Sequence, residues 1–357
     1  MNGILPIYNH KKHARIAMLI VTALAFGGGM VQSWRGTALI PGLVRHAEIS
    51  AADKAYFRNL ESQERLTILR KMGKDEGSEA VYAFLKAVYP DEPGSEHELV
   101  HIVGEIAFLE RQYDAFQTCD SFFRFGCYHG VILQAIKERG GGNDILKSLG
   151  QGCLNLQSNR TAITACLHGI GHGLMVVRSY DLLESYKDCD IMLDEQPDLF
   201  FCYDGVSMEN VVRRFEQEGA KDFLVSKDPF YPCDSVPDKY QAACVREHVH
   251  HARRVFYKKD TLATARFCLH FPDESVRTEC FGGLGNAINQ DNSDHPETNI
   301  AECDKTGQHY RQYCIGTAAT QYAFSRQFDK AQMLCNALAG REREGCLFSV
   351  ESARSSL

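Results

Sequence analysis

Residues 166–173 read Cys166-Leu-His168-Gly-Ile-Gly-His172-Gly173, a run with a cysteine, two histidines four residues apart and three glycines. Its opening recurs in weaker form at Cys127-Tyr-His129-Gly130, Cys202-Tyr-Asp204-Gly205, Cys280-Phe-Gly282-Gly283 and Cys314-Ile-Gly316. Recurrence of one short pattern indicates a chain built from copies of one structural unit. Only some copies keep the histidines, which makes these residues candidates for function.

The cysteines predict how each unit is closed. There are fourteen, and taken in order they form seven pairs whose members lie 8 to 13 residues apart. An even count with such regular spacing is typical of a disulfide framework, and the CxxC spacing of zinc ribbons does not occur. The predicted pairs are Cys119–Cys127, Cys153–Cys166, Cys189–Cys202, Cys233–Cys244, Cys268–Cys280, Cys303–Cys314 and Cys335–Cys346. Disulfides persist in oxidising compartments, so the pairs place this region outside the cytoplasm.

The repeat predicts an all-α fold. The second cysteines of the pairs recur every 32 to 42 residues, which is the period of a repeat array. Residues such as Asp181 and Asp260 suit helix starts, and there is little of the period-two alternation that indicates strands. We therefore expect residues 95–357 to form a right-handed α-solenoid of about seven disulfide-closed helical hairpins. Its period and helical content resemble tetratricopeptide repeats in shape only; the consensus is absent, so the resemblance implies no function.

A recurrent glycine predicts close helix packing. It lies three residues after the second cysteine of four pairs, as Gly130, Gly169, Gly205 and Gly283. Small residues at a joint between helices allow their backbones to approach. The alternative is that glycine leaves room for a ligand, above all beside His168 and His172, where Gly171 and Gly173 are additional.

The first 94 residues carry a targeting signal and a helical lead. Basic residues between Lys11 and Arg15 precede an apolar run over 16–31, the pattern of a signal-anchor or a signal peptide. We expect residues 1–36 to hold a cytoplasmic tail and this membrane segment, and residues 37–94 a linker and helices. The repeat domain would then be periplasmic, lumenal or extracellular, and secreted if the signal is cleaved. The net charge of -7, with no long basic run after the N-terminus, argues against nucleic acid as a partner.

Two aligned positions of the repeat, here called columns, are rich in the residue types that bind metals. Positions two and six residues after each second cysteine lie on one helical face, because residues four apart are neighbours on a helix. These positions predict metal ligands at His129, His168 and His172, and alignment of the leading unit, which has no cysteines, adds His101 and Glu105. Possible further ligands are Asp204 in the same columns and, one unit later, His248 and His250. Imidazole and carboxylate together suit transition metals such as zinc, copper or iron.

The predicted function is metal binding outside the cytoplasm, on the inner stripe of the solenoid. In a metalloenzyme the ion would act as Lewis acid, water activator or redox centre, and the sequence does not choose among these or show that there is catalysis. The alternative is a scaffold that binds a protein partner through the same polar stripe without metal. A scaffold gives no reason for ligand-type residues to gather in the leading units.

A third interpretation is a metallopeptidase. The run His97-Glu98-Leu-Val-His101 resembles the zincin motif HExxH over five residues, and the resemblance implies Glu98 as general base. The third histidine of metzincins is replaced by Ala107. Ser95 and Glu98 also form a capping box, which explains the glutamate by helix initiation alone. A zincin-type enzyme would lose its activity on Glu98→Gln.

Overall fold

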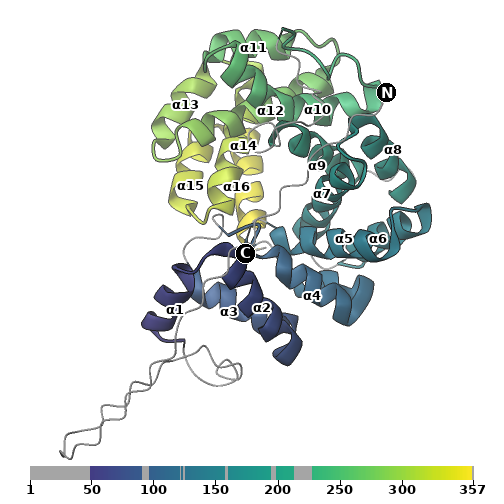
Figure 1. The fold of residues 1–357 in the computed structure, drawn as a ribbon. Helices are drawn as coiled ribbons and strands as arrows, with labels where there is room; N and C mark the ends of the chain where they lie inside the picture. Colours follow the sequence, from purple (N-terminus) through teal and green to yellow (C-terminus); the bar gives the residue numbers. More distant parts are fainter. Residues whose placement is uncertain are drawn as a thin grey trace, which may run out of the picture. The chain divides into compact units, whose positions relative to one another are not determined.

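The computed structural model describes residues 49–90, 96–120, 122–123, 125–156, 160–193, 198–212 and 227–355. The chain divides into two units, Met1–Ala38 and Leu39–Leu357, and every described residue belongs to the second. The described residues form helices and no strand, as the sequence predicts (Figure 1). None of these helices is long and apolar enough to cross a membrane. The predicted membrane segment at 16–31 lies outside the described residues and stays a prediction.

The helical lead forms three helices. The first, α1 (Ala51–Arg58), begins at Ser50, whose side-chain oxygen accepts a hydrogen bond from the backbone N–H of Asp53. It is followed by α2 (Ser62–Glu76) and α3 (Ser78–Val88). Both α2 and α3 contact α4, so the lead and the repeats belong to one unit.

The repeat region is a series of paired helices. It opens with α4 (His101–Arg111). Six helical hairpins follow within the described residues: η2 (Gln112–Thr118) with α5 (Gly126–Arg139), α6 (Asn143–Leu154) with α7 (Arg160–Val177), α8 (Leu182–Leu193) with α9 (Leu199–Val212), α11 (Thr261–Leu269) with α12 (Glu274–Asp291), α13 (Pro296–Asp304) with α14 (Gln308–Phe324), and α15 (Phe328–Asn336) with α16 (Gly340–Ser355). The remaining pair differs, because residues 227–237 before α10 (Asp238–His251) are turns and loop; η4 (Ala252–Phe256) continues α10.

All seven predicted disulfides are confirmed. Each joins two consecutive cysteines, with Cα atoms 5.4 to 5.9 Å apart, and none of the fourteen is free. In the six hairpins the disulfide ties the end of the first helix to the second helix of the same hairpin. Seven such bonds indicate an oxidising environment outside the cytoplasm.

The second helices of the units pack against one another in chain order. Contacts run from α4 to α5, α7, α9, α10, α12, α14 and α16, each helix touching the next (Figure 1). The first helices also meet, since α6 contacts α8 and α13 contacts α15. This is the nearest-neighbour packing of a repeat array. Some contacts are not between neighbours. The ring of Phe125, just before α5, lies 6.0 Å from the ring of Phe324 at the end of α14, and the guanidinium of Arg326 lies 4.5 Å from the centre of the Phe122 ring.

Glycine sets the approach of these helices. A Cβ atom on Gly130 would lie 1.9 Å from the backbone oxygen of His101, and one on Gly205 would lie 1.9 Å from that of His168. No side chain fits at such a distance, so the backbones of α4 and α5, and of α7 and α9, meet directly at these residues. The packing interpretation of the glycine column is confirmed at both positions.

Alanine at Gly205 is expected to lower the free energy of unfolding by about 1–3 kcal/mol, because α9 has to move away from α7. Chemical denaturation measures the change. Gly316→Ala is the matched control, since Gly316 also lies inside a second helix, but a Cβ atom there would meet no neighbouring group of the described chain within 4 Å. At that position alanine should be neutral or stabilising by up to about 1 kcal/mol. Equal effects at the two sites would contradict the packing role of Gly205.

Candidate metal centre

Three histidines from two segments of the chain meet beside the α4–α5 contact. His97 lies in the turns before α4, His101 is the first residue of α4, and His129 is in the first turn of α5. The contact between Gly130 and the His101 backbone brings the two helices close enough for the rings to meet. One ligand nitrogen from each ring lies within 4.8 Å of the other two, and no other group of three possible ligands in the described ranges is this compact.

Hydrogen bonds fix part of this group and leave part of it without a partner. His97 Nδ1 lies 3.1 Å from the backbone oxygen of Phe123, so this nitrogen carries the proton and donates it. His97 Nε2 then carries a lone pair and no proton, and it lies 3.0 Å from His129 Nδ1. The Nε2 atoms of His101 and His129 are buried and have no hydrogen-bond partner among the described residues. Buried polar nitrogens without partners are unfavourable, and a metal ion would supply the missing bonds.

Burial keeps the imidazoles of His101 and His129 neutral. It lowers the pKa of His101 to about 3, helped by the nearby His97 and His172. Burial also holds the pKa of His129 well below its usual value, with His172, His97 and His101 adding to the effect. Neutral imidazole is the form that binds metal, so His101 and His129 need no deprotonation at neutral pH.

A second pair of histidines lies one unit further along, on α7. His168 and His172 face each other through their Nε2 atoms, which are 3.1 Å apart. Each ring is held from behind by a carboxylate of α9: His168 Nδ1 lies 3.1 Å from Asp204, and His172 Nδ1 lies 2.7 Å from Glu209. Asp204, predicted as a possible ligand, thus orients a histidine in this structure.

The two groups of histidines adjoin each other. The ring of His129 lies 4.8 Å from the ring of His172, measured between centroids. Polar contacts continue from His168 through Asp204 to α10, because Asp204 Oδ1 lies 3.5 Å from Nε of Arg246. Arg246 also pairs with Glu279. Burial alone would raise the pKa of Asp204, but the hydrogen bond from His168 and the charge of Arg246 outweigh it and lower the pKa.

The other predicted ligands have different neighbours. Glu105 pairs with Arg70 of α2, at 3.3 Å. His248 Nε2 donates to the backbone oxygen of Pro229 at 2.9 Å, and the pKa of His250 falls to about 4 through burial and then the charge of Arg254. A ligand role for Glu105, His248 and His250 stays a prediction, and these residues are not part of the compact group.

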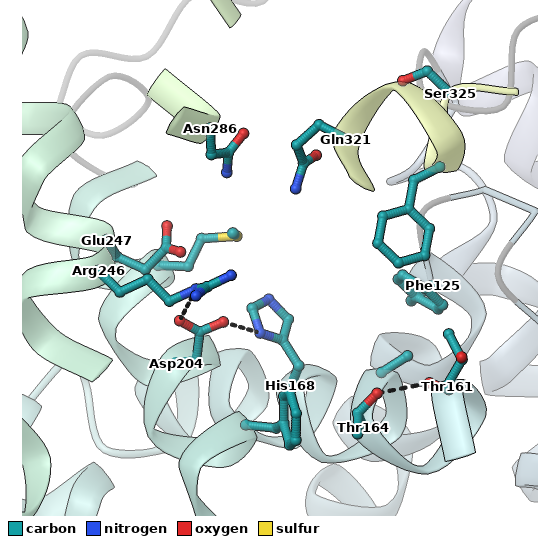
Figure 2. Close-up of a pocket in the computed structure, with 14 residues that line it drawn as sticks. Phe125, Thr161, Thr164, His168, Asp204, Arg246, Glu247, Asn286, Gln321 and Ser325 are labelled. Atoms are coloured by element: carbon teal, nitrogen blue, oxygen red, sulfur yellow. Dashed lines mark hydrogen bonds and ion pairs between the residues drawn. The ribbon is translucent and has the colours of Figure 1, made fainter. Parts of the chain in front are cut away.

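A cavity of about 300 Å³ opens beside His168. Figure 2 shows side chains from successive units around it, with His168, Asp204, Arg246 and Asn286 among them. Glu247 also lines the cavity, and burial together with the charge of Asp204 raises the pKa of its carboxyl well above the usual value, against the opposing effect of Arg246. Water or a small ligand in this cavity could therefore reach His168, one member of the His168–His172 pair.

Comparison of the chain with protein-family models, with curated proteins and with solved structures finds no match. Any function proposed for the protein therefore has to be argued from the geometry of the site.

Proposed function

We propose that the protein is an extracytoplasmic metal-binding protein whose ion is held by His97, His101 and His129. The observation that carries the proposal is the compact group of three imidazoles, two of which have a buried nitrogen without a partner among the described residues. Three neutral nitrogen ligands suit zinc, copper or iron. Of the five predicted ligands, His101 and His129 belong to this set, together with His97. Glu105, His168 and His172 do not.

A three-histidine centre leaves a coordination position for water or substrate. This is the arrangement of catalytic zinc sites, whereas structural sites close all four positions with protein ligands. We therefore propose that the centre serves chemistry at the ion and not only the stability of the fold. When bound, the ion would polarise an oxygen ligand or lower the pKa of a bound water. The three histidines would hold the ion, and the backbone oxygen of Phe123 would orient the ring of His97.

The structure does not favour the peptidase alternative. Residues 96–100 are turns, so His97 and Glu98 precede the helix that begins at His101, whereas a zincin carries its motif on a helix. The Glu98 side chain is exposed to solvent. The capping partner Ser95 lies outside the described residues. The scaffold alternative does not explain why one buried nitrogen of His101 and one of His129 have no hydrogen-bond partner in the described part of the chain.

Metal content tests the proposal. Residues 37–357 are purified from an oxidising compartment without a metal-affinity tag, and bound metals are quantified by mass spectrometry before and after zinc is added and the excess removed. We expect at least one tightly bound equivalent per chain, and one equivalent fewer in His101→Ala. His295→Ala is the matched control, since the His295 side chain is 68% exposed. A folded protein that stays metal-free after zinc addition would overturn the proposal, as would unchanged content in His101→Ala.

A further inference from the structure

We propose that His168 and His172 form a second metal position, next to the three-histidine centre and open to the cavity. This second position extends the proposed function and rests on it, because it requires that the protein meets metal ions in its compartment. Its geometry is independent, since the pair lies on α7 and none of the three histidines of the first centre belongs to it.

The hydrogen bonds of the pair fix which nitrogens carry protons. An ionised carboxylate only accepts hydrogen bonds, so Nδ1 of His168 must donate to Asp204 and Nδ1 of His172 must donate to Glu209. In a neutral imidazole the other nitrogen then has a lone pair and no proton. The two Nε2 atoms, 3.1 Å apart, therefore direct lone pairs at each other. Such a contact is repulsive unless a cation lies between them.

A metal ion satisfies this geometry. Two nitrogens bound to one ion at about 2.05 Å are about 3.3 Å apart in a tetrahedral site and about 2.9 Å apart at right angles. The observed 3.1 Å lies between these values. Metal-binding histidines commonly donate their second N–H to a carboxylate, which orients the ring and makes the ligand more basic. Both histidines of the pair have this partner, supplied by the same helix, α9.

The competing cation is a proton shared between the two rings. Burial disfavours it, because the His172 side chain is only 14% exposed and a charged imidazole is unfavourable away from water. The pair supplies two protein ligands and His168 lines the cavity, so the remaining positions on a metal would be open to water or a small ligand from there. A divalent ion bound by only two imidazoles should be weaker than one bound by three.

The experiment is a zinc titration of the full chain, with the number of equivalents read by competition against a chromophoric chelator. We expect two equivalents in the wild type, the second at least tenfold weaker than the first. His172→Ala should lose the weaker equivalent and keep the tight one. Glu209→Gln should keep both but weaken the second by about 10–100-fold, the usual effect of losing such a partner. His309→Ala is the control, because His309 makes the same 2.7 Å contact with Glu274 on the surface.

The outcomes separate this proposal from the proposed function. A single tight equivalent, unchanged in His172→Ala, would overturn the second position and leave the first centre intact. Loss of the tight equivalent alone in His101→Ala, with the weak one retained, would support both sites as distinct. A second variant guards against misfolding, since Glu209→Gln keeps the size of the side chain. A strongly downfield N–H signal from the pair in the presence of excess zinc would show a shared proton in its place, and would also overturn the proposal.

Discussion

Replacing His129 by alanine is expected to lower the affinity of the protein for its first zinc ion by about a thousandfold or more. Losing a residue that merely orients a ligand costs about 10–100-fold, and losing a direct ligand should cost more. His129 is the only ligand supplied by α5, while His97 and His101 come from the segment before it. Without His129 the site keeps only His97 and His101, which are four residues apart, and has no ligand from α5.

The measurement is a competition titration with a chelator of known affinity, on wild type and variant under the same conditions. His129 is buried, so alanine leaves a small cavity, and denaturation must first establish that the variant is folded. His129→Asn provides a second variant that fills more of the space. His295→Ala again serves as the surface control. An affinity within tenfold of wild type in a folded His129 variant would exclude it as a ligand.

Replacing both Cys189 and Cys202 by alanine is expected to lower the free energy of unfolding by about 3 kcal/mol. A disulfide that closes a loop of this length restricts the unfolded chain by about that amount in the chain-entropy model. This bond joins α8 to α9, the helix that carries Asp204 and Glu209. The loss should therefore also loosen the carboxylates that hold His168 and His172. Urea denaturation gives the stability, and the weaker zinc equivalent reports on the site.

The pair Cys335–Cys346 provides the comparison. It closes a similar loop, of 11 residues against 13, in the last hairpin of the chain. Its removal should destabilise that hairpin but leave the zinc affinities unchanged, because repeats act mainly on their neighbours. Less than about 0.5 kcal/mol of destabilisation on removing Cys189 and Cys202 would contradict the structural role given to that bond.

The sequence predicts the fold well wherever the signal is local. Cysteine spacing gives every disulfide, because both partners lie within one short loop. Caps are equally local: Asp260 starts α11 by accepting from the N–H of Ala263, as predicted. The prediction of a first helix in every unit is wrong for two units, where the local pattern does not determine the conformation. The helix expected before Cys119 is the short 3₁₀ helix η2, and the described residues before Cys233 form turns and loop.

The site is only partly predictable for the same reason. Helical spacing finds His129, His168 and His172, which lie on helices at the expected positions. Helical spacing does not find His97, because this residue lies in turns. The sequence analysis names His97 only as part of the peptidase motif. Glu209 is missed because it lies seven residues after Cys202, outside both columns, and only the packing of α9 on α7 brings it to His172.

Crystallographic anomalous scattering at the zinc edge tests the central claim most directly, because it locates the ion itself. In crystals of the zinc-loaded protein we predict a strong anomalous peak about 2.1 Å from a ring nitrogen of each of His97, His101 and His129. A weaker peak between His168 and His172 is the expected companion. A protein that crystallises with zinc present and has no anomalous peak at the three histidines, or has its strongest peak elsewhere, would contradict the account.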